Sequence, residues 1–165
     1  MAKEHSFDIT AKIDMQNFKN AINLVDREVS NRYDFKGTTY EVTFNEKAKT
    51  LVLIASSDNK VDALKDIVIA KFLKQNLSSK VLDELKVEDS SGGNRKMTFK
   101  VVDYIESKEA KKICADIKKL KLKVTANIEG DSIRIKGAKL DELQKVIAMV
   151  KEGEWEAPLV FENMR

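Results

Sequence analysis

The chain has 165 residues, of which 42% are hydrophobic and 35% are charged, with a formal net charge of +3. These values predict one folded domain or two small ones and exclude a disordered chain. No apolar run approaches the roughly 18 residues that a membrane helix needs, and the first residues lack the apolar core of an export signal. The single cysteine cannot form an internal disulfide, so we expect a cytoplasmic protein without a membrane partner.

The composition also argues against most enzyme classes. The only histidine, His5, is close to the N-terminus, and no second histidine exists to join it in a zinc site or a catalytic triad. The chain contains neither the Gly-x-x-x-x-Gly-Lys-Ser/Thr loop nor the Gly-x-Gly-x-x-Gly motif, both of which bind phosphates. We therefore expect no catalytic residues, no metal and no cofactor, although the many carboxylates leave acid–base chemistry open.

The first half of the chain predicts the element order β-α-β-β-α. Residues 6–13 alternate between apolar and polar side chains, as a half-buried strand does. Asp14 is a good helix N-cap, and apolar residues then follow at helical spacing to about residue 32. The elements expected next are strands over 39–44 and 50–56 and a helix that Ser57 or Asp58 could cap.

The second half predicts the same order again, followed by one more strand. Residues 76–95 are less regular; residues 80–87 could hold one strand, and Ser90–Asn94 is the best candidate for a linker. The elements expected after it are a strand over 97–101, a helix capped by Ser107, hairpin strands over 123–128 and 132–136, a helix from about 140 and a strand over 159–161.

This repeated order is the ferredoxin-like plan, in which two helices cover one face of an antiparallel sheet and leave the other face open. We therefore predict an α+β protein of two tandem ferredoxin-like (β-α-β-β-α-β) sandwiches, with domains over residues 1–92 and 93–165. The sequence leaves open whether the first strand of each half completes its own sheet or the sheet of the neighbour.

The excess of positive charge falls in the second half of the chain. Residues 95–165 contain more basic than acidic side chains, whereas residues 1–94 are nearly balanced. At about 100° per residue, the helix lysines fall opposite its apolar stripe, and strand alternation places other cations on the open sheet face. The residues expected to contact or attract phosphate are Lys111, Lys112, Lys118, Lys119, Lys121, Lys123, Arg134 and Lys136.

Two interpretations of these cations remain open. A lysine-rich helix face is more often simply solvated, so the sheet face is more informative. Lys123, Arg134 and Lys136 have hydroxyl and amide side chains between them, and together these groups could donate to phosphates. The outward positions lack the aromatic residues on which RNA-recognition sheets stack bases. We therefore favour phosphate contact, which would be sensitive to salt and weakly sequence-specific.

The loop Arg32–Gly37 is a second candidate site, because it combines two cations, two aromatic rings and a carboxylate. A base could stack on Tyr33 or Phe35 while Arg32 or Lys36 contacts a phosphate. The alternative, which the spacing alone favours, is that Phe35 anchors the loop in the core and Arg32 stabilises the helix end.

Several short stretches match a known pattern in order and spacing. They are Ser6–Ile9, Asn31–Gly37, Glu109–Ile113, Lys121–Val124, Gly130-Asp131, Arg134, Asp141–Gln144 and Pro158-Leu159. Through them the chain resembles the YajQ family of small bacterial proteins over nearly its whole length. It departs from the family pattern at Asp103-Tyr104, Glu129 and Met164, where Gln-Gly, Gln and an aromatic residue are common.

The resemblance implies two tandem ferredoxin-like units, for which exchanged N-terminal strands are one arrangement, and a cytoplasmic nucleotide-binding protein that is not an enzyme. Similar proteins are associated with purine nucleotides such as GTP or ATP, with RNA such as tRNA and, in some members, with cyclic di-GMP. We therefore expect a regulatory binder that has one of these ligands and, in some settings, a protein partner. The alternatives are a protein-interaction adaptor in transcriptional regulation, for which nucleotide binding is incidental, and a nucleotide hydrolase.

Overall fold

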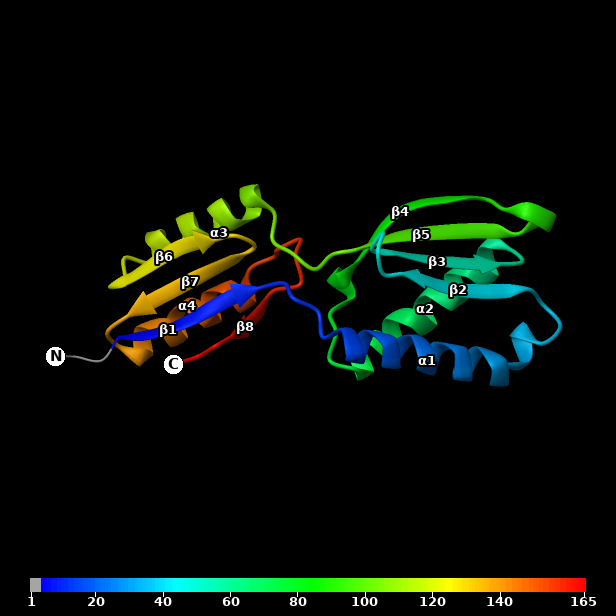
Figure 1. Ribbon diagram of the computed structural model, residues 1–165, viewed down its shortest axis with the longest axis horizontal. Coiled ribbons are helices and arrows are strands. Elements are labelled where there is room, and N and C mark those ends of the chain that lie inside the picture. Colours follow the sequence, from blue (N-terminus) through cyan, green and yellow to red (C-terminus); the bar gives the residue numbers. More distant parts are fainter. Residues whose placement is uncertain (1–3) are drawn as a thin grey trace. The chain divides into compact units, whose positions relative to one another are not determined.

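The computed structural model describes residues 4–165, and these residues form two compact units (Figure 1). The continuous unit is Ile13–Val102, and the split unit combines the N-terminal segment through Lys12 with Asp103–Arg165. Each unit has one four-stranded antiparallel sheet and two α-helices. The predicted α+β class with tandem ferredoxin-like sandwiches is confirmed.

The continuous unit consists of two helices packed on one face of its sheet (Figure 1). Its elements are α1 (Met15–Asn31), β2 (Tyr40–Asn45), β3 (Thr50–Ala55), α2 (Asp58–Lys74), β4 (Leu82–Asp89) and β5 (Arg95–Val101). The strand order is β2-β3-β5-β4. Phe18 and Phe72 from the helices pack with Leu51, Leu53 and Phe99 from the strands to form the core.

The split unit repeats this arrangement. Its elements are β1 (His5–Thr10), α3 (Ser107–Lys119), β6 (Val124–Glu129), β7 (Ser132–Gly137), α4 (Leu140–Glu152) and β8 (Val160–Glu162). The strand order is β6-β7-β1-β8. Phe7 and Ile135 from the sheet are fully buried, and so are Ile113 and Leu143 from the helices.

The first strand of each half lies in the sheet of the other half. β1 precedes α1 in the chain but pairs with β7 and β8, and β5 precedes α3 but pairs with β3 and β4. The sequence left open which sheet each first strand completes, and the structure shows that both strands are exchanged. Because of this exchange, the bounds of the two compact units differ from the domain ranges 1–92 and 93–165.

The stretch Ser90–Asn94 is the turn of a hairpin rather than a linker between domains. It joins β4 to β5, and the backbone N–H of Ser90 donates to the carbonyl of Asn94 at 2.8 Å. Gly92 and Gly93 have φ values of 71° and 78°, which glycine adopts without steric cost. Glycine and serine serve turns and linkers alike, so the composition alone did not separate the two.

Two of the three predicted helix caps are confirmed, and the third differs from the structure by one position. Asp14 caps α1 as predicted, because its carboxylate accepts from a backbone N–H one turn into the helix. Ser57, not Asp58, caps α2. Ser107 is the first residue of α3, and Glu106 occupies its cap position.

Among residues 4–165, none of the helices combines the length and apolar character needed to span a bilayer.

Candidate functional site

The open face of the split unit's sheet carries the cations expected on its central strands. Arg134 and Lys136 lie on β7, opposite Asn127 and Thr125 on β6. Lys123 comes directly before β6 and is exposed. The structure thus brings Arg134 and Lys136 onto one face and places Lys123 beside the end of the adjacent strand.

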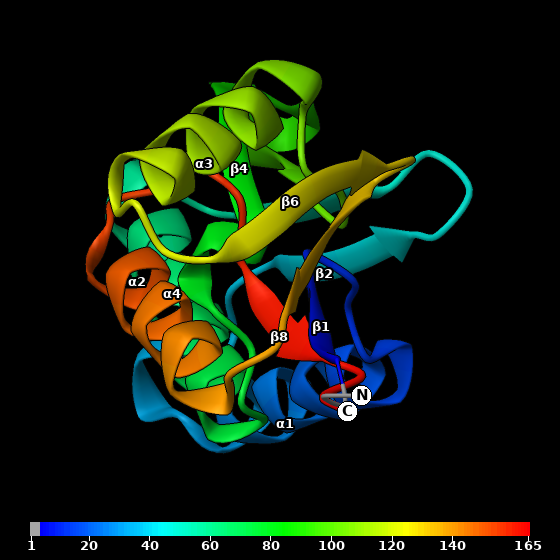
Figure 2. The same cartoon turned by 90° about the vertical axis from the view of Figure 1, so that its left-hand side faces the viewer.

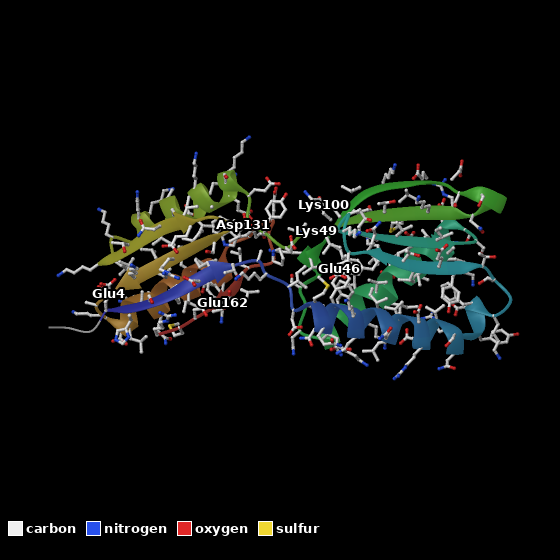
Figure 3. All side chains as sticks on the ribbon, in the orientation of Figure 1. Glu4, Glu46, Lys49, Lys100, Asp131 and Glu162 are labelled. Atoms are coloured by element: carbon white, nitrogen blue, oxygen red, sulfur yellow. The ribbon has the colours of Figure 1, made fainter. Side chains whose placement is uncertain are left out.

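Arg134 is held by a carboxylate that the sequence did not connect to it. Its cross-strand neighbour on β1 is Asp8, which is only 7% exposed. Arg134 Nε donates to Asp8 Oδ1 at 3.0 Å, and Asn163 donates its amide N–H to Asp8 Oδ2 at 2.8 Å. Glu129 Oε2 lies 3.7 Å from the same Nε. Asp131, in the β6–β7 turn, and Glu162, on β8, add further carboxylates to this unit (Figure 3).

The ion pair keeps both partners charged. The hydrogen bond from Arg134 is the main reason why the pKa of Asp8 lies below its usual value, and burial opposes this effect. The same bond raises the pKa of Arg134. The guanidinium is therefore largely compensated by Asp8 and Glu129, and it is less available to a phosphate than the sequence suggested.

The lysines of α3 form a different surface on the same unit. They lie on the side of the helix opposite the buried residues Ala110, Ile113 and Ile117, as the helical spacing predicted. The exposed members are Lys108, Lys111, Lys112, Lys118 and Lys119, followed by Lys121 after the helix. Lys119 lies 3.8 Å from Asp116. Within residues 4–165, no ion pair reaches Lys111, Lys112 or Lys118.

A groove runs between α3 and the edge strand β6, which lie side by side (Figure 2). Its volume is about 350 Å³. The residues that line this α3–β6 groove are Lys111, Cys114, Ala115 and Lys118 from the helix and Ala126, Asn127 and Ile128 from the strand. Small and apolar side chains therefore form the walls, and two of the unpaired lysines border them.

Cys114 lies at the boundary between the core of the split unit and the α3–β6 groove. It packs against the buried cluster and is half-buried, but it also lines the groove. Burial is the main reason why the pKa of its thiol is raised, and the charge of Lys118 opposes this effect. The thiol is thus mostly protonated near neutral pH but borders a cavity.

The loop Arg32–Gly37 lies in the continuous unit, and its two aromatic rings differ in exposure to solvent. Phe35 is 3% exposed and packs in the core, so no base can stack on it, whereas Tyr33 is 88% exposed. Arg32 makes a two-point contact with Asp34, with Nε–Oδ1 and Nη2–Oδ2 distances of 3.0 Å each. The burial of Phe35 agrees with its expected role as the residue that anchors the loop in the core. Tyr33 is the one ring of the pair that a base could reach.

The two cations of this loop, Arg32 and Lys36, also differ in their contacts. Arg32 also lies 3.7 Å from Glu28, and its bond to Asp34 is the main reason why the pKa of that carboxyl is lowered. Lys60 donates to the backbone carbonyl of Asp34, and its ammonium lies 5.1 Å from the Phe35 ring centroid. Lys36 is exposed. Arg32 therefore holds the loop in shape, and Lys36 extends into solvent.

Comparison with known proteins identifies the family. The model of the family described as "Nucleotide-binding protein YajQ-like" matches residues 5–165. The chain belongs to this family. A protein of Sulfurimonas denitrificans named "Nucleotide-binding protein" is 80% identical over 165 residues, which cover 100% of both chains. A protein with the same name from Sulfurovum sp. is 57% identical over 166 residues, and "Nucleotide-binding protein Cj0374" of Campylobacter jejuni is 42% identical over 165, again with full coverage of both chains.

The family match confirms the resemblance to YajQ proteins, and the structure adds two features of this YajQ-like chain that sequence reasoning missed. One is Asp8, whose outward position was visible in the alternation but whose sheet was not. The other is the α3–β6 groove, for which the only signal was the small size of Cys114, Ala115 and Ala126. In the described part of the chain, no group of three or more His, Cys, Asp or Glu side chains could hold a metal ion.

Proposed function

We propose that the chain is a non-catalytic nucleotide-binding protein whose split unit holds ligand phosphates on lysine side chains. The family description and the names of relatives up to 80% identical support nucleotide binding. The ligand classes that fit are purine nucleotides, cyclic dinucleotides and RNA such as tRNA, because all of them present phosphates. We further propose a regulatory role for this binder and a cytoplasmic location, the latter in keeping with the single cysteine.

The observation that carries the proposal is the contrast between the lysines of α3 and the two arginines of the candidate sites, Arg32 and Arg134. Arg134 and Arg32 are each engaged by carboxylates within their own unit. Lys111, Lys112 and Lys118 are exposed and carry no ion pair with any residue from 4 to 165. Unpaired ammonium groups gathered on one helix face attract phosphate at long range and contact it directly. Lys136 on β7 and Lys123 just before β6 belong to the open face of the sheet, and we propose that they add phosphate contacts there.

Three carboxyl groups with a lowered pKa are ion-pair partners and do not have the raised pKa of a catalytic base. Asp8 is paired with Arg134, Glu28 with Lys71, and Asp34 with Arg32, and in each case the hydrogen bond from the cation is the largest cause of the lowered pKa. A catalytic base near neutral pH needs a raised carboxyl pKa. These three groups therefore act as structural ion-pair partners.

Titration of the pure protein with GTP, cyclic di-GMP and tRNA, at about 50 and about 200 mM salt, tests the proposal. A triple variant replaces Lys111, Lys112 and Lys118 with alanine. The control variant replaces Lys47 and Lys80, which are exposed lysines of the continuous unit. We expect affinity to fall with salt, and to fall about tenfold or more in the triple variant but not in the control. If the affinity changes neither with salt concentration nor in the triple variant, the proposal is rejected.

A further inference from the structure

We infer that the α3–β6 groove is the base-binding site: a purine base inserts between α3 and β6, and the ammonium groups of Lys111 and Lys118 bind the attached phosphates. This inference rests on the proposed function and names the place and the ligand class. It goes beyond the sequence expectation, in which the open sheet face and the lysines act without a pocket for the base.

The lining residues place the groove at the edge of the sheet. Successive residues of a strand point to opposite faces, so a groove on one face would be lined by alternate residues. Here the consecutive residues Ala126, Asn127 and Ile128 all line it. β6 is the end strand of its sheet, and an edge strand presents backbone N–H and C=O groups along its free side. Such groups can pair with the donors and acceptors on the edge of a purine.

The walls of the groove suit a flat aromatic ring. Cys114 and Ala115 on one side and Ala126 on the other are small, and Ile128, which is 44% exposed, adds apolar surface. A volume of about 350 Å³ lies at the lower end of the range that is typical of small-molecule pockets. Burial of a base against these side chains would release the water that now covers them.

The two lysines provide the charge that a nucleotide requires. Lys111 and Lys118 are two helical turns apart, which corresponds to about 10 Å along the axis, and both line the groove. Positions separated by three or four residues share a helix face, so Cys114 lies between the two lysines. A base bound at Cys114 would therefore have an ammonium group within reach of its phosphates on either side.

The length of the groove favours a nucleotide over an extended peptide. A peptide that adds a strand to a sheet edge pairs along most of that edge, and strands usually have five or six residues. The groove involves three residues of β6. Two lysines bordering a short apolar cavity match the size and charge of one nucleotide.

Cys114 allows a direct test of where the nucleotide binds. It is the only cysteine of the chain, so a thiol reagent reports on this position alone. The rate of alkylation is measured with GTP, with ATP and with inorganic triphosphate, which carries the phosphates without the base. We expect saturating GTP or ATP to slow alkylation about tenfold, and triphosphate to slow it much less.

A matched pair of variants separates filling of the groove from general effects of substitution. Ala115→Leu places a larger side chain in the groove, and Ala148→Leu makes the same change at an exposed position of α4. Leucine and alanine are both strong helix formers, so both variants should fold. We expect Ala115→Leu to weaken GTP binding about tenfold and Ala148→Leu to leave it unchanged.

The outcomes distinguish this inference from the proposed function. If GTP binds but neither protects Cys114 nor responds to Ala115→Leu, the groove is not the base site, while nucleotide binding stands. If triphosphate protects Cys114 as well as GTP does, the groove binds phosphate alone and the base-binding assignment is overturned. If no nucleotide binds at all, the proposed function fails together with the inference.

Discussion

Arg134 on β7 and Asp8 on β1 are joined by a hydrogen bond of 3.0 Å between Nε and Oδ1, although 126 residues separate them in the chain. Asp8 is nearly buried, and the amide of Asn163 adjoins its second oxygen. The contact fixes the exchanged strand β1 in the sheet of the split unit. It links the N-terminal segment to the half of the chain that carries the candidate site.

The variant Asp8→Asn tests the contribution of this contact. Asparagine keeps the shape of the side chain but removes the charge that accepts from Arg134, and we expect a loss of about 1–3 kcal/mol in the free energy of unfolding. Asp58→Asn is the control, because Asp58 pairs with Arg95 at 2.7 Å while remaining 70% exposed. Urea unfolding should show a much smaller loss for the control; equal losses would contradict the importance of burial at Asp8.

The same pair predicts a dependence of stability on pH. The pKa of Asp8 is lower in the folded protein than its ordinary value of 3.8. The stabilisation is therefore complete above the unfolded-state pKa and is lost as the pH falls through the folded-state pKa. We expect the stability difference between the wild type and Asp8→Asn to be full at about pH 7 and to shrink below about pH 4. Urea unfolding of both proteins across this range measures it, and a difference that grows towards low pH would have the wrong sign.

The exchange of strands predicts how fragments of the chain behave. Ile13–Val102 contains every strand of its own sheet, so this fragment should fold alone. Asp103–Arg165 lacks the central strand β1 and should remain unfolded until a peptide of residues 4–12 is added. Circular dichroism and amide exchange distinguish these states. If the Asp103–Arg165 fragment is folded without the peptide and does not change when it is added, this result would contradict the observed pairing of β1.

The sequence revealed most elements because their hydrophobic periods are clear, but it did not reveal which sheet receives each first strand. β1 and β5 both contain buried side chains on successive positions, such as Asp8 and Ile9 or Thr98 and Phe99, and either sheet could accept such a strand. The α3–β6 groove was also beyond prediction. It depends on the approach of a helix to a sheet edge, and Cys114 has the same identity whether it faces the core or a cavity.

The two rings of the Arg32–Gly37 loop should respond differently to substitution. Phe35→Ala removes a buried ring and should cost about 3–5 kcal/mol of stability. Tyr33→Ala should leave stability nearly unchanged, because the side chain is 88% exposed. If this loop stacks a base, Tyr33→Ala should weaken binding of single-stranded RNA by about 1–3 kcal/mol. Fluorescence titration with a short RNA measures the effect, and unchanged affinity would remove Tyr33 from the candidate site.

The most direct measurement is a map of backbone amide shifts in the isotope-labelled full chain on addition of GTP and, separately, cyclic di-GMP. Binding to the split unit predicts that the largest shifts fall on α3 and β6, around Lys111, Lys118 and Asn127. Shifts concentrated within Ile13–Val102, or no shifts with either ligand, would contradict it.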